Sequence, residues 1–417
     1  MSLALRHVLD LPLAAELTRK EGSSIVLVFL CTTLGAVLSR WHLRLILPTV
    51  VVEIVLGILI GPDALDIATV NEYITFLSNF GLALLFFFAG LEVIEHHVPP
   101  EILRRGTMGW GMSLAIGVAF GVGLESAGVE VTWWLLAVAL ATTALGTLVP
   151  ILSDARLLPT PIGQAVLGTG VAGEFWPIIF ISVFLTSVYG AVTEVLLLVG
   201  FGALVAGAAT LALRTRPPRV LRILRDTLHT TGQAGVRASI FVLALLVFVA
   251  ADAGFEFVLG AFAAGVLVGL VLDSPEGKVV RVRLDGIGFG FLVPVYFVVT
   301  GMTFDIDSLL TVKGLSLAAI FLALLLVTRG ASAFLWLREL GPRGTASLAL
   351  FGATGLPLIV AIVGIGSERG DVSDSVGASL IGAGMISVLV YPFIATRLAT
   401  LYADEDATVE TVETLEY

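Results

Sequence analysis

Stretches of about 20 mostly apolar residues recur along almost the whole chain, and each is long enough for a helix that crosses a bilayer. Inside lipid, only helices and closed barrels satisfy all their backbone hydrogen bonds, and runs of this length favour helices. Charged residues make up 13% of the 417 residues, against about 25% in soluble domains. The sequence therefore predicts an all-α integral membrane protein.

The apolar stretches separate into about thirteen expected transmembrane helices. Their ranges are 23–39, 43–61, 74–93, 107–127, 132–153, 162–188, 193–213, 235–251, 254–272, 285–303, 314–337, 344–366 and 376–400. With the N-terminus outside, the cytoplasmic loops hold 17 of the 23 basic residues, the outer segments hold 5, and Arg329 lies within a span. This asymmetry agrees with the positive-inside rule and predicts a cytoplasmic C-terminus. The excess of Arg over Lys, 20 against 3, hints at a prokaryotic source, so we expect the inner (plasma) membrane of a prokaryote.

Three polar segments accompany the transmembrane domain, which we expect over residues 23–400. Residues 1–22 are too charged for a cleavable signal peptide and form either an amphipathic lead-in or a disordered terminus. Residues 214–237 alternate Arg with aliphatic residues, which favours an amphipathic cytoplasmic linker helix over a plain charged loop. Residues 401–417 form a short acidic cytoplasmic tail, and we expect no regulatory domain there.

Two expected spans carry Gly, Thr and Pro in their middle. They contain ATTALGTLVPIL at 141–152 and FGATGLPLIV at 351–360. Glycine permits unusual backbone angles and proline removes a donor, so both helices can unwind within the membrane. A matched pair of interrupted spans indicates a transporter with inverted repeats, here of five helices each over about 43–188 and about 254–400. The alternative is that Gly and Pro are simply common in membrane helices.

Three charged residues lie well inside expected spans, away from their ends: Glu174, Arg329 and Glu53. A charge at the bilayer centre costs about 2.5–3.5 kcal/mol or more, so each needs a reason. A lone carboxylate such as Glu174 can hold either a proton or a cation, which is sufficient for exchange. The alternative is a structural ion pair between Glu174 and Arg329. For Arg329 we expect a charge-compensating role, and for Glu53 a gate or packing role.

Other residues near the interruptions complete the candidate site. We expect them to supply oxygen ligands or, at the glycine, room for the unwound chain; they are Thr142, Thr143, Thr354 and Gly173. Each threonine can equally be one that hydrogen-bonds its own helix. No zinc spacing, nucleophile elbow, phosphate loop or basic nucleic-acid patch is visible, so we expect no enzyme, no cofactor and no nucleic-acid partner.

Four motifs resemble the second family of monovalent cation–proton antiporters, which includes bacterial sodium/proton and potassium-efflux antiporters. They are LPTVVVEIVLGILIGP at 47–62, FGLALLFFFAGLEV at 80–93, VLGAFAAGVLVG at 258–269 and VYFVVTGMTFD at 295–305. The resemblance covers roughly residues 25–400. It implies thirteen spans, a dimer-forming domain, a mobile core with two crossing broken helices, elevator-type alternating access and a homodimer.

The resemblance also assigns residues. Gly173-Glu174 stands where the family usually has Asp-Asp, Asn-Asp or Gln-Asp, and Arg329 stands where it has Lys or Arg. With a single carboxylate, the simplest cycle is electroneutral exchange of one Na⁺ or K⁺ for one H⁺. The alternatives are a sodium-coupled symporter of an organic anion on the same fold, with Arg329 binding the anion, and a non-transporting membrane sensor.

Overall fold

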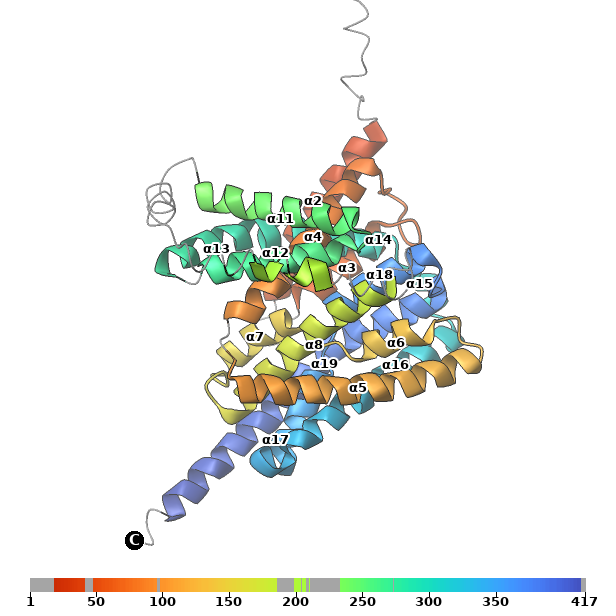
Figure 1. Cartoon of the computed structure of the whole chain (residues 1–417). Coiled ribbons are helices and arrows are strands. Elements are labelled where there is room, and N and C mark those ends of the chain that lie inside the picture. Colours follow the sequence, from red (N-terminus) through yellow and green to blue (C-terminus); the bar gives the residue numbers. More distant parts are fainter. Residues whose placement is uncertain are drawn as a thin grey trace, which may run out of the picture. The chain divides into compact units, whose positions relative to one another are not determined.

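The computed structural model describes residues 19–41, 48–95, 98–185, 199–203, 205–207, 210, 233–272 and 274–413 (Figure 1). The helices bounded within these residues are α2 (Arg19–Trp41), α3 (Thr49–Ile60), α4 (Glu72–Glu95), α5 (Pro100–Ser126), α6 (Trp133–Leu140), α7 (Leu145–Asp154), α8 (Pro161–Leu185), α11 (Ala234–Asp252), α12 (Phe257–Leu272), α13 (Pro275–Ile287), η1 (Gly288–Leu292), α14 (Val293–Met302), α15 (Ile306–Leu309), α16 (Val312–Ala333), η2 (Phe334–Trp336), α17 (Leu337–Gly352), α18 (Pro357–Arg369) and α19 (Asp374–Glu413). Apart from one isolated β-bridge, the regular structure of the described chain is helical, which confirms the all-α prediction.

The described helices account for the expected spans with one exception. Nine helical runs are long and apolar enough to cross a membrane, and one of them, Val312–Arg369, is 58 residues long and covers the eleventh and twelfth spans. Two shorter apolar helices, Thr49–Ile60 and Phe257–Leu272, correspond to the second and ninth spans. The seventh span, 193–213, lies mostly outside the described residues.

The three polar segments also lie wholly or partly outside the described residues. This holds for residues 1–18 of the lead-in, for 214–232 of the linker and for the last four residues of the tail. The last helix, α19, continues to Glu413, past the expected end of its span at residue 400. The tenth span begins earlier than expected, because α13, the π-helical turn η1 and α14 follow one another without a break.

One compact unit comprises Met1–Phe80 and Pro294–Phe304. Its apolar core contains Val28 and Cys31 of α2 together with Val298 and Met302 of α14. Glu53 of α3 is 3% exposed. Its aliphatic stem lies against Gly35, where an added methyl group would come within 2.9 Å of the Glu53 Cγ atom. The role of Glu53 as a gate or in packing stays a prediction.

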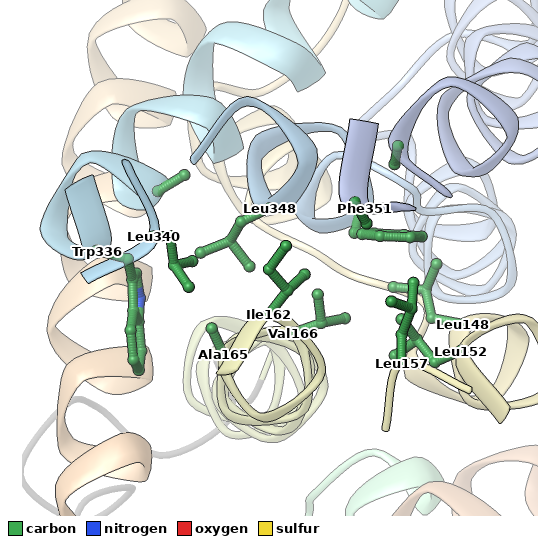
Figure 2. Close-up of a cluster of buried hydrophobic side chains, with 13 residues drawn as sticks. Leu148, Leu152, Leu157, Ile162, Ala165, Val166, Trp336, Leu340, Leu348 and Phe351 are labelled. Carbon is green, nitrogen blue, oxygen red and sulfur yellow. The ribbon is translucent and has the colours of Figure 1, made fainter. Parts of the chain in front are cut away.

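The other unit comprises Gly81–Val293 and Asp305–Tyr417, and it holds both interrupted spans. Helices α5, α8, α16, α17 and α19 pack on one another around them (Figure 1). Figure 2 shows one of its apolar clusters, in which Leu148 and Leu152 of α7 and Ile162 of α8 meet Leu348 and Phe351 of α17. This cluster fixes α7 against the helices that carry the candidate site.

The two interrupted spans are broken where the sequence predicts, and they run in opposite directions. Residues 141–144 separate α6 from α7, and residues 353–356 separate α17 from α18. Between these breaks, the amide of Ala144 donates to the carbonyl of Thr354 at 2.8 Å. At the ends of the spans, the amide of Thr132, before α6, donates to the carbonyl of Asp371, after α18, at 2.8 Å. The start of one span therefore lies beside the end of the other, as crossing antiparallel helices require.

Candidate functional site

Glu174 lies in the middle of α8 and is 5% exposed. Its Oε1 atom accepts hydrogen bonds from the amides of Leu145, at 2.7 Å, and Gly146, at 3.4 Å. These are the first two amides of α7, which have no partner within their own helix and lie at the positive end of its dipole. Because the first interrupted span unwinds before Leu145, the amides of Leu145 and Gly146 are available to bind the Glu174 carboxylate. The other carboxylate oxygen, Oε2, is buried and has no hydrogen-bond partner within the described part of the chain.

Arg329 lies in α16 and is 1% exposed. Its guanidinium donates to the carbonyl of Gly352 at 3.3 Å, to the carbonyl of Thr169 at 3.1 Å and to the hydroxyl of Ser113 at 3.3 Å. Gly352 is the last residue of α17, where carbonyls lack helical partners and the dipole is negative. The guanidinium is thus bound to a helix end, and its charge-compensating role stays a prediction. Among the described residues, no hydrogen bond or ion pair joins Arg329 to Glu174. No pattern in the sequence indicated Ser113 and Thr169 as its partners.

The three candidate threonines are fully buried, and their hydroxyl protons are used within the protein. Thr142 donates to the carbonyl of Ala139 at 2.9 Å, and Thr354 donates to that of Leu350 at 3.1 Å, so both bond within their own span. Thr143 donates to the carbonyl of Gly352 at 2.7 Å and so joins the two interrupted spans. Each hydroxyl oxygen keeps a lone pair, so a role as a cation ligand stays a prediction.

Gly173 lies where α8 passes the break in the first interrupted span. Its carbonyl accepts a hydrogen bond from the amide of Thr143 at 3.2 Å. A methyl group added at Gly173 would lie 2.8 Å from both Cβ and Oγ1 of Thr143 and 3.0 Å from Nη2 of Arg329. The absence of a side chain at Gly173 therefore leaves room for Thr143 and Arg329 to approach α8 closely.

We expect Gly173→Ala to lower stability, because overpacking a filled site costs about 1–3 kcal/mol. The measurement is the midpoint of thermal unfolding in detergent, which should fall by several degrees. Gly364→Ala in α18 is the matched control, since an added methyl group there meets no atom within 4 Å. Equal midpoints for the two variants would contradict the packing assigned to Gly173.

Glu92 is a site residue that the sequence reasoning missed. It lies in the last turn of α4, and both of its carboxylate oxygens are near Gly146. The available signal was an acid within an expected apolar span, in the GLE sequence used only to establish the resemblance. Glu92 and Glu174 are far apart in the sequence, but both lie near Gly146 in the first turn of α7.

The site thus consists of a buried carboxylate bound to a helix start, near a guanidinium bound to a helix end. A family model described as sodium/hydrogen exchanger, transmembrane, matches residues 25–401. The chain belongs to the sodium/hydrogen exchanger family. The resemblance read from the four motifs is therefore confirmed.

Several relatives of this exchanger-family chain carry antiporter names. It is 28% identical over 392 residues to "Putative Na(+)/H(+) antiporter YjbQ" of Bacillus subtilis, with 90% of this chain and 63% of that protein covered. It is 24% identical to "Probable Na(+)/H(+) antiporter 3" of Methanocaldococcus jannaschii, with 84% and 90% covered. It is 26% identical to the Na(+)/H(+)-K(+) antiporter GerN of Bacillus cereus, with 68% and 72% covered. The chain thus spans less than two thirds of the length of the Bacillus subtilis protein.

Proposed function

We propose that this exchanger-family protein is a secondary antiporter that exchanges a monovalent cation, Na⁺ or K⁺, for H⁺. The observation that carries the proposal is the state of Glu174, which is buried and held through Oε1, and whose Oε2 has no hydrogen-bond partner among the described residues. A buried carboxylate without a countercharge is costly unless something neutralises it. A proton and a cation each do so. The antiporter names of the relatives support the same reading.

Competition for one carboxylate is sufficient for the exchange cycle. Oε1 is bound to the α7 amides, so the carboxylate keeps its position while Oε2 takes either a proton or a cation. A cation taken up on one side of the membrane is released on the other side when a proton replaces it there, and the return movement carries that proton back. The negative charge of Glu174 is neutralised by one positive charge both in the cation-bound state and in the protonated state. The cycle is therefore electroneutral. Arg329 is occupied by two carbonyls and a hydroxyl and takes no part in the proton count.

We propose alternating access by an elevator-type movement of the core in a homodimer, as the family resemblance implies. The N-terminus lies outside and the C-terminus in the cytoplasm of a prokaryotic plasma membrane, in agreement with the distribution of basic residues. The broken spans suit transport because their unwound backbone places polar groups within the membrane without exposing them to lipid.

The test uses purified protein in liposomes with a trapped pH dye. Na⁺ or K⁺ is added against an imposed proton gradient, with and without a clamped membrane potential. We expect cation-dependent proton movement that is absent from protein-free liposomes and does not respond to the clamp. No cation response from a folded preparation would refute antiport. Substrate-dependent Na⁺ uptake without proton movement would instead identify a symporter, and absence of all flux would favour a sensor.

The pH dependence follows from the same competition. Because protons and cations bind one carboxylate, we expect exchange to fall as the pH is lowered and protons occupy the site. Raising the cation concentration should restore the rate and move the falling limb to lower pH. Initial rates measured over a grid of pH and Na⁺ or K⁺ concentration check this. A falling limb that stays at one pH at all cation concentrations would contradict a shared site.

A further inference from the structure

Glu92 and Glu174 approach the same residue from different helices. A methyl group built on Gly146 would lie 3.2 Å from Oε1 of Glu92 and 3.5 Å from its Oε2. The amide of Gly146 is 3.4 Å from Oε1 of Glu174. Both carboxylates therefore lie at the first turn of α7, and the three residues Glu92, Gly146 and Glu174 belong to one compact unit.

The two carboxylates differ in their access to the surroundings. Glu174 is buried, Glu92 is partly exposed and Gly146 between them is exposed. Glu92 is in the last turn of α4, where the expected span ends. The series Glu92, Gly146, Glu174 thus leads from the surface to the buried carboxylate.

The electrostatics of this series favour a cation. Glu92 lies within electrostatic reach of Glu174, so a cation at this place is attracted by two negative charges. A negative charge at the mouth of a low-dielectric site also raises the local concentration of cations. The unpartnered, buried Oε2 of Glu174 independently indicates a ligand at the inner end.

We propose that Glu92 is a second ion-binding carboxylate, which takes up Na⁺ or K⁺ at the exposed start of α7 and passes it to Glu174. This inference rests on the proposed antiport and adds a residue that sets cation affinity. The two carboxylates then have different roles. Glu174 is the buried group whose occupancy couples cation and proton, and Glu92 determines at what cation concentration that site fills.

The experiment compares the full-length wild type with Glu92→Gln in the liposome assay, titrating Na⁺ and K⁺ at several pH values. We expect the half-saturating cation concentration to rise about tenfold in Glu92→Gln, more than the maximal rate falls, because the local cation concentration is reduced. Glu92→Asp, which keeps the charge, should recover most of the affinity. Glu101→Gln is the matched control, since it removes one exposed negative charge in the first turn of α5.

A second readout does not depend on transport. Cation-dependent thermal stabilisation of the detergent-solubilised proteins should show the same order of affinities. If Glu92→Gln does not fold, Gly146→Ala replaces it, because its methyl group comes within 3.2 Å of Glu92 Oε1 and should also weaken cation uptake.

The outcomes separate this inference from the proposed function. An unchanged half-saturating concentration in Glu92→Gln, or a reduced maximal rate alone, overturns the role of Glu92 and leaves antiport intact. An unchanged value in Gly146→Ala overturns it in the same way if that variant is the one measured. A wild type without cation-driven proton movement refutes antiport itself, whatever Glu92 does.

Discussion

Glu174→Gln is expected to lower cation-driven proton movement by at least about a hundredfold, the size of effect that follows loss of an essential proton-transferring group. The amide side chain has almost the shape of the carboxylate, and its oxygen can still accept from the amides of Leu145 and Gly146. What it lacks is a charge for a cation to neutralise and a site for a transported proton. The fold should therefore survive while exchange is lost. The measurement is the liposome assay with Na⁺ and with K⁺.

Two controls accompany Glu174→Gln. Gel filtration and thermal unfolding should show a folded protein, which separates loss of function from loss of structure. Glu174→Asp keeps a titrating group but shortens the side chain, so we expect weak, measurable exchange. Near-normal exchange by a folded Glu174→Gln variant would remove Glu174 from the mechanism and with it the antiport cycle proposed above.

The second large effect is expected at Arg329, and it is on stability. Arg329→Met removes two buried hydrogen bonds from a charged donor, those to the carbonyls of Gly352 and Thr169, although the Gly352 carbonyl keeps the bond from Thr143. Hydrogen bonds to charged groups contribute about 1.5–3 kcal/mol each, so losing the two should cost about 3–6 kcal/mol. We expect poor yield and a much lower unfolding midpoint, measured by thermal unfolding in detergent. Ser113→Ala is the matched control, because it removes only one of the three contacts and should cost far less.

Arg329→Met also tests the idea of an ion pair with Glu174. If Arg329 served mainly to neutralise Glu174, removing both charges in Glu174→Gln/Arg329→Met would restore stability relative to Arg329→Met alone. We expect no such recovery, because the partners of the guanidinium among the described residues are two carbonyls and a hydroxyl. Recovery of the unfolding midpoint in the double variant would contradict this assignment.

The sequence predicts the membrane class and the position of the interrupted spans well, because both depend on local composition. A run of apolar residues is long enough to cross lipid wherever it occurs, so the expected spans correspond to helices throughout the described residues. Glu174 and Arg329 stand out for the same reason, since a charge in an apolar span has few explanations. Both are buried in the structure.

The exact position of the first break could not be predicted from the local sequence alone. Pro150 was part of the signal for unwinding, yet α7 continues through it and the break lies earlier, at residues 141–144. In the second interrupted span the proline does mark the boundary, because Pro357 is the first residue of α18. The first break is stabilised from elsewhere, by hydrogen bonds that Thr143 and Ala144 make to Gly173 and to the second interrupted span.

By itself, the sequence determined that the chain is helical, that it spans a membrane, and which residues carry charges that lipid would not tolerate. Only the tertiary structure decided what those charges contact. It placed Glu174 on the start of α7, directed Arg329 to the end of α17 and brought Glu92 beside Gly146. The physical reason is that unwound helix ends present backbone groups needing partners, and those partners come from spans that only packing brings together.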